Sequence, residues 1–225
     1  MRDKWDRIIQ IYAITKSLFI ECEETDPELK TNLQPLNEQK AVLDHVIRMM
    51  YSSYSPNLEE EFESNYKKAI GHLCRAFYDV SDMLSINIRN KISELLAPYT
   101  SDEIRVALPE YYSTLKPEIE SINKAISAMR NKKGISIRDD ADFNMLLAEP
   151  EDLGENEFED YYNKIIVLKE IYIRIQRAVP SLEDIHKRQS KTKKREHLEK
   201  LIFLIIGAVI TAVVTIIIAV LRGGS

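Results

Sequence analysis

Residues 66–84, YKKAIGHLCRAFYDVSDML, begin the longest regular pattern in the chain. Apolar side chains recur there every three or four residues, which is the spacing of one face of an α-helix. The pattern extends to Pro98, and Ser55-Pro56 offers a helix start ahead of it. The spacing therefore predicts a central helix over residues 57–97. The repeating positions are Tyr66, Ile70, Leu73, Phe77, Val80, Leu84, Ile88, Ile92 and Leu95.

Helical spacing also dominates the rest of the first 180 residues. Only six glycines occur in 225 residues, and no alternating run predicts a strand. Further helices are expected over residues 3–23 and 38–54, between Thr100 and Gly134, and from Phe158 to Pro180, which is expected to end or kink the last of them. A polar aperiodic stretch lies at 134–154. Residues 1–180 are therefore expected to form an all-α, antiparallel bundle of about five helices.

Each of these helices has an apolar stripe that predicts its buried face. The first stripe is Ile8, Ile11, Tyr12, Leu18, Phe19 and Cys22, with Thr15 as its one polar member. The second is Val42, Val46, Met49 and Met50 or their neighbours, and the last is Phe158, Tyr162, Ile165, Leu168, Tyr172 and Ile175. Thr100 and Glu103 have the spacing of a capping box.

Residues 201–221, LIFLIIGAVITAVVTIIIAVL, contain no charged side chain. At about 1.5 Å per residue, 21 helical residues reach about 31 Å, close to the roughly 30 Å hydrocarbon core of a bilayer. The segment predicts one C-terminal transmembrane helix, followed by a short tail at 222–225. A threonine inside such a helix can return its hydroxyl to its own backbone.

The charges around this segment predict its orientation. Seven basic residues precede it within 181–200, and only Arg222 follows it. Because basic flanks stay in the cytoplasm, the N-terminus is expected in the cytosol and the C-terminus outside. The charged start MRDKWDRIIQ does not resemble a signal peptide. Residues 181–200 are expected as a basic linker or helix that also attracts anionic headgroups. The seven are Lys187, Arg188, Lys191, Lys193, Lys194, Arg195 and Lys200.

The body of the chain is strongly acidic. Residues 1–186 carry 23 Lys and Arg against 34 Asp and Glu, a formal charge of −11. This charge argues against general nucleic-acid binding. The two cysteines, Cys22 and Cys74, form no CxxC pair and are expected as small, reduced core side chains. Neither a metal nor a cofactor is expected.

A near-repeat supplies the candidate ligand site. Residues 45–51, HVIRMMY, and 72–78, HLCRAFY, share the pattern H-x-x-R-x-apolar-Y. Histidine and arginine three residues apart share a helix face, and antiparallel pairing of the two helices would bring both clusters together. The cluster could bind a phosphate or nucleotide, or it could be a structural network that fixes helix register. The candidate residues are His45, Arg48, His72, Arg75 and Asp79, with Asp44 and Asp82 as further counter-charges.

A small-residue face lies within the predicted span. Gly207, Thr211, Thr215 and Ala219 recur every four residues, a pattern that lets membrane helices approach closely. Homo-oligomerisation through this helix is therefore expected.

The sequence favours a non-enzymatic, tail-anchored membrane protein. Its cytosolic helical domain is expected to bind a protein partner or sense a signal, with self-association in the membrane. The alternative is a membrane-tethered enzyme or an RNase-like, nucleotide- or RNA-sensing effector that uses the His45/Arg48 and His72/Arg75 clusters. No familiar catalytic motif is present, and no arginine precedes a histidine at the spacing of the helical HEPN-type RNases.

Overall fold

The computed structural model describes residues 2–26, 33–54, 56–135 and 155–223, with side chains described in these ranges except at 53, 129–135, 155–157 and 212–223. Within these ranges all regular structure is helical and no strand occurs. The expected all-α class is confirmed. The elements are α1 (Arg2–Thr25), α2 (Leu33–Tyr51), η1 (Ser52–Tyr54), α3 (Leu58–Leu96), α4 (Ser101–Ala107), η2 (Tyr111–Leu115), α5 (Lys116–Ile135) and α6 (Glu155–Gly223).

The helices belong to two compact units. The first unit comprises Met1–Pro98 and Glu110–Gln176, and the second comprises Tyr99–Pro109 and Arg177–Ser225. The first contains α1, α2, α3, η2, α5 and the start of α6. The second contains α4 and the remainder of α6. The polar stretch at 136–154 lies outside the described residues.

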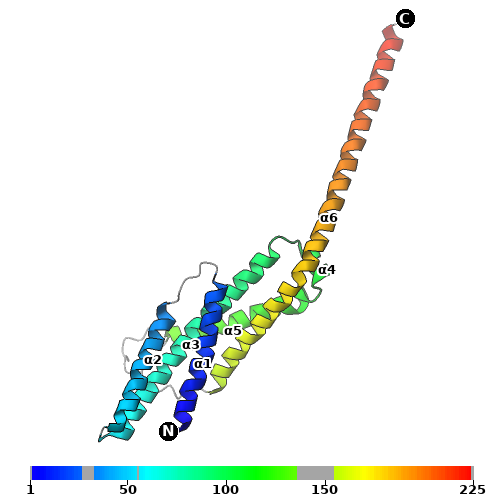
Figure 1. The fold of residues 1–225 in the computed structure, drawn as a ribbon. Helices are drawn as coiled ribbons and strands as arrows, with labels where there is room; N and C mark the ends of the chain where they lie inside the picture. Colours follow the sequence, from blue (N-terminus) through cyan, green and yellow to red (C-terminus); the bar gives the residue numbers. More distant parts are fainter. Residues whose placement is uncertain (1, 27–32, 55, 136–154, 224–225) are drawn as a thin grey trace. The chain divides into compact units, whose positions relative to one another are not determined.

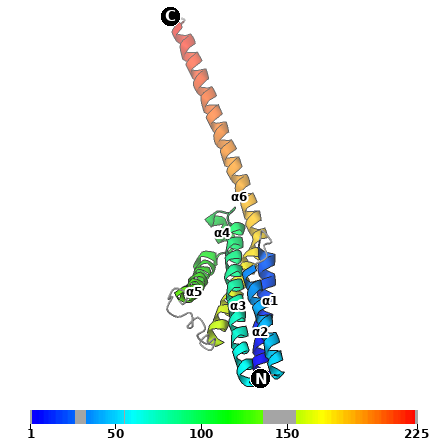
Figure 2. The ribbon, with the colours of Figure 1, turned by 90° about the vertical axis from the view of Figure 1, so that its left-hand side faces the viewer.

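Helix α3 is the centre of the first unit, as the sequence predicted. Helix α2 pairs with it in the opposite direction, since Glu38 contacts His72 whereas the later His45 contacts the earlier Asn65. Helix α1 runs parallel to α3, because Trp5, near the start of α1, makes an edge-to-face contact with Phe62, near the start of α3. Cys22 likewise lies beside Asn87 at the far end of both helices. In Figures 1 and 2, α2 runs in the opposite direction to α1 and α3.

The beginning of α6 completes the core of the first unit. Its Phe158 ring lies 4.2 Å from that of Phe77, and the Tyr161 ring lies 5.2 Å from that of Tyr78, centroid to centroid. Lys169 forms an ion pair with Glu21, so α6 also lies against α1. Large apolar side chains of this kind contribute about 1.5–3 kcal/mol each when fully buried.

Most of the predicted buried stripe is confirmed. On α1, Ile8, Ile11, Thr15, Leu18 and Cys22 are buried. Tyr12 was wrongly included and is exposed. The polar Thr15 donates its hydroxyl to the Ile11 carbonyl at 2.8 Å, which satisfies it within its own helix.

On α2, Val42 and Met49 are buried as predicted, but Met50 was wrongly included and is exposed. On α6 the differences are shifts of one position. Tyr161 and Ile171 are buried on α6, whereas the expected Tyr162 and Tyr172 are only partly covered. Both cysteines are buried and neither is in a disulfide within the described part of the chain, which confirms them as core side chains.

The second unit begins with the capping box that the sequence predicted. The Thr100 hydroxyl accepts from the Glu103 backbone N–H, and the Glu103 carboxylate accepts from the Thr100 backbone N–H. These bonds satisfy donors at the start of α4 that have no partner within the helix.

The rest of the second unit is the continuation of α6. Residues 181–200, expected as a linker or a helix, are helical, and Pro180 lies inside α6 rather than at its end. Among the residues described with side chains, which reach Thr211, no helix is long and apolar enough to cross a membrane. Side chains 212–221 of the predicted span lie outside that part.

Candidate functional site

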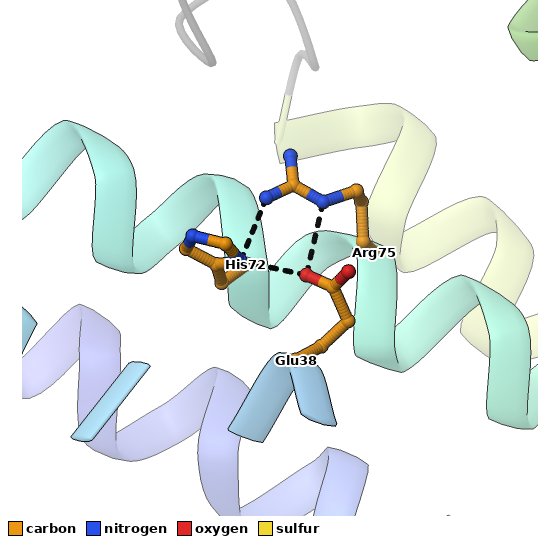
Figure 3. Close-up of polar contacts among 3 residues, drawn as sticks. All are labelled: Glu38, His72 and Arg75. Atoms are coloured by element: carbon orange, nitrogen blue, oxygen red, sulfur yellow. Dashed lines mark hydrogen bonds and ion pairs between the residues drawn. The ribbon is translucent and has the colours of Figure 1, made fainter. Parts of the chain in front are cut away.

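Three of the five candidate residues, His45, His72 and Arg75, meet where α2 crosses α3. The His72 Nδ1 lies 2.7 Å from the Glu38 Oε2, and the Arg75 Nε donates to the same oxygen at 3.0 Å. The Arg75 Nη2 also lies 2.8 Å from the His72 Nδ1. Figure 3 shows Glu38 reaching from α2 to both side chains on α3.

The hydrogen-bond partner of His72 indicates which ring nitrogen carries a proton. The Glu38 carboxylate only accepts, so the short contact to Nδ1 is stable when Nδ1 carries a proton and donates it to Oε2. A protonated Nδ1 cannot also accept from Arg75. Arg75 is therefore held through its Nε, which donates to Glu38, rather than through a bond from its Nη2 to the imidazole ring.

His45 extends the network along the same crossing. Its ring stacks on that of His72 at a centroid distance of 5.4 Å and an interplanar angle of 23°. The Asn65 Nδ2 donates to the Glu61 carbonyl at 2.8 Å, which turns its Oδ1 towards His45. The His45 Nδ1 lies 3.0 Å from that oxygen and donates to it.

The other two candidates are placed differently. The exposed Arg48 pairs with Asp44 of its own helix at 3.0 Å. Asp79 is half-buried one turn after Arg75. Asp82, a suggested counter-charge, instead accepts from the Tyr161 hydroxyl of α6. The structure thus brings together His45, His72 and Arg75, but not as two His/Arg pairs.

Sequence reasoning missed Glu38 and Asn65. A signal for Glu38 was present, since it lies seven residues before His45 and so two turns along the same helix face. Asn65 likewise lies seven residues before His72. An antiparallel pairing of the two histidines makes both residues neighbours of the cluster.

The arrangement has the features of a network that fixes register. Glu38 is mostly covered, with 19% of its side chain exposed, and it serves two partners on α3. Shifting α2 along α3 by one turn would separate all three groups. Because Arg75 is 53% exposed, its ion pair contributes only about 0.2–1 kcal/mol.

A second surface feature lies on the outer side of α2 and continues onto η1. Five large apolar side chains follow one another at helical spacing and remain exposed, in contrast to Val42 and Met49 on the inner side. Exposed glutamates at 59–61 begin α3 just beyond this surface. The five, called the outer α2 surface below, are Leu43, Ile47, Met50, Tyr51 and Tyr54.

The third feature is the apolar part of α6. The side chains of residues 201–211 are exposed on all sides, among them Phe203 at 74% and Leu204 at 75%. A Cβ added to Gly207 would meet nothing within 4 Å. The Thr211 hydroxyl donates to the Gly207 carbonyl at 2.9 Å, as predicted for a threonine in such a segment. The side chains of Thr215 and Ala219 lie outside the described part.

All seven predicted basic residues before this segment are exposed on α6. Lys187 pairs with Glu183 at 3.3 Å, and Arg188 pairs with Asp184 at 3.2 Å. Both pairs are exposed contacts within one helix and contribute about 0.3–0.5 kcal/mol each.

Comparison with known proteins finds no family model, no curated protein and no solved structure that matches the chain. The function therefore has to be argued from the chain itself.

Removing Glu38 tests the network. Glu38→Ala is expected to lower the free energy of unfolding by about 1–2 kcal/mol, because a half-buried His72 donor loses its acceptor. The matched control Asp44→Ala removes an exposed pair and is expected to cost about 0.5 kcal/mol or less. Urea unfolding of the full-length protein in nonionic detergent, followed by fluorescence of the single tryptophan, Trp5, measures both.

Equal losses in the two variants would contradict the network. A Glu38→Ala protein that kept its stability but lost a bound nucleotide or an RNA-cleaving activity would favour the alternative of an enzyme or nucleotide sensor.

Proposed function

We propose that the protein is a non-enzymatic, membrane-anchored helical module with its body in the cytosol. The observation that carries this proposal is the exposure of the uncharged residues 201–211 around the whole circumference of α6. In water such a surface is unfavourable by roughly 25 cal/mol per Å² of apolar area, whereas in a bilayer it needs no covering partner.

The sequence on both sides supports the same placement. Ten further uncharged residues follow, up to Leu221, and the seven basic residues precede Leu201. Lysine and arginine next to a span are retained in the cytoplasm, and they gain about 1 kcal/mol each near an anionic surface. We infer a single-pass anchor over residues 201–221 with the N-terminus inside and the C-terminus outside.

Anchorage and orientation can be tested together. A reporter before Met1 is expected in the cytosol and one after Ser225 outside it, with the protein resistant to carbonate extraction. Val209→Arg with Ile210→Arg is expected to release the protein, since each arginine near the span centre costs about 2.5–3.5 kcal/mol. The control Val209→Leu with Ile210→Leu is expected to remain inserted. Extraction of the unmodified protein by carbonate would contradict the anchor.

We propose further that the body binds a protein partner through the outer α2 surface. Its four α2 residues recur at i, i+4, i+7 and i+8, which matches the ridge of one helix, and Tyr54 of η1 extends it. The exposed glutamates at 59–61 and the charge of the body favour a basic partner. A basic amphipathic segment of a cytosolic protein fits both the apolar ridge and the acidic end.

Site-specific photocrosslinking in the producing cells tests this surface. A photoreactive residue at Tyr54 is expected to give one discrete adduct whose partner peptide is basic and amphipathic. The adduct is expected to disappear in an Ile47→Glu background, because a buried charge disrupts apolar docking. The control position is Gln10, exposed on α1. Equal adducts from Gln10, or an adduct with a second copy of this chain, would refute the proposed partner.

Self-association in the membrane is the third part of the proposal. Small side chains at Gly207 and Thr211 lie on one face of α6, and the space beside Gly207 is open. Lipid supplies no hydrophobic drive for helices to meet, so association depends on close backbone approach across a small face.

Filling that face tests association. Gly207→Ile with Thr211→Ile keeps the segment apolar and is expected to preserve insertion, while self-association in a membrane two-hybrid reporter falls strongly. The control Ile205→Val with Val209→Ile alters side-chain shape on the opposite face without a net change in volume and is expected to have little effect. Undiminished association in the first variant would leave this segment as an anchor only.

A further inference from the structure

A groove in the second unit gathers basic side chains of α6 beside the start of α4. Both walls belong to the same unit. Its α6 side carries His186, Lys193, Lys194 and His197, and its α4 side carries Thr100 and Glu103.

The α6 residues form one face of the helix. Lys193 and Lys194 follow His186 by seven and eight residues, and His197 follows it by eleven. These spacings are two and three helical turns. Of the basic segment, Lys193 and Lys194 therefore line the groove, whereas Lys187 and Arg188 do not.

The two lysines of the groove differ from the earlier cations in charge compensation. Lys187 and Arg188 each have a carboxylate of the same helix within 3.3 Å. Across the described part of the chain, Lys193 and Lys194 have no ion pair. Two adjacent positive charges in one groove are thus available to an anion.

The acidic residue in the groove is already engaged. Only 2% of Glu103 is exposed, and its carboxylate accepts from the Thr100 N–H at 2.7 Å and from the His186 Nδ1 at 3.0 Å. The Thr100 N–H, with the Thr100 hydroxyl and His186, holds the pKa of Glu103 below its ordinary value against the opposing effect of burial. Glu103 therefore stays ionised, and its buried carboxylate positions the His186 ring while its oxygens are directed at the Thr100 N–H and the His186 Nδ1.

We propose that this groove binds a phosphate monoester, presented by a lipid headgroup at the membrane surface. The inference rests on the proposed membrane anchor. A phosphate monoester carries a charge of about −1.5 to −2 near neutral pH, which two lysines complement, whereas the phosphodiester of an ordinary anionic lipid carries about −1.

The position of the groove favours a lipid source. His197 lies four residues before Leu201, and Lys194 lies seven residues before Leu201. These separations are about 6 Å and about 10 Å along the helix. The headgroup region extends roughly 5–8 Å beyond the hydrocarbon core, and lysine side chains reach along the helix towards it. The groove then opens at headgroup level.

The test uses full-length protein in nonionic micelles. Dihexanoyl phosphatidic acid supplies a monoester, dihexanoyl phosphatidylglycerol supplies an anionic diester, and inorganic phosphate supplies the ion without acyl chains. The groove variant is Lys193→Gln with Lys194→Gln. The matched control is Lys187→Gln with Arg188→Gln, which removes the same charge from the same helix.

Phosphatidic acid is expected to bind saturably and more tightly than phosphatidylglycerol. The groove variant is expected to weaken this binding by about tenfold, and the control variant by about twofold or less. The same pattern with inorganic phosphate, without a gain from acyl chains, would support the phosphate site and assign it a soluble ligand. No saturation, equal binding of the two lipids, or equal losses in the two variants would overturn the site. Carbonate resistance of both variants separates this failure from failure of the anchor.

Discussion

The burial of α3 is the constraint on which the rest of the first unit depends. Between Ala69 and Ile88 this helix buries side chains on most of its circumference, so one neighbouring helix cannot cover it. Helices α1, α2 and the start of α6 each cover a different part. Very small side chains at Ala69, Ala76, Ser81 and Ser85, all fully buried, let these neighbours approach closely. The Ser81 and Ser85 hydroxyls have no hydrogen-bond partner among the described residues, which is a cost that the apolar contacts offset.

The polar network of Glu38, His72 and Arg75 has its role within this apolar packing. His72 and Arg75 lie on a part of α3 that is not fully buried, and Glu38 reaches them from α2. Large buried side chains contribute about 1.5–3 kcal/mol each, against about 0.2–1 kcal/mol for a partly exposed ion pair. The apolar contacts therefore supply stability. The network distinguishes between registers of α2 that would bury similar apolar area, which is the best-attested role of such groups.

Charge is divided along the chain in a way that agrees with the proposed membrane anchor. The acidic body discourages contact with anionic lipid and nucleic acid, while the exposed cations of α6 are gathered next to the apolar segment. The structure divides these cations further, into those paired with a carboxylate and those that line the groove. Lys187 and Arg188 are compensated by carboxylates one turn earlier, whereas Lys193 and Lys194 line a groove with His186 and His197. Attraction to a surface and recognition of a particular group can thus reside on different residues of one helix.

The sequence by itself determined the helical class, the extent of α3, the capping box at Thr100 and the burial of both cysteines, because each depends on local spacing or on side-chain type. It also placed the uncharged segment at 201–221. Only the tertiary structure decided that Tyr161 rather than Tyr162 enters the core, since adjacent helix positions differ by 100° and the neighbour's direction chooses between them. Only the structure joined Glu38 to His72 and Arg75, and Glu103 to His186. These partners lie 34, 37 and 83 residues apart, and such contacts follow from how helices pack rather than from any local pattern.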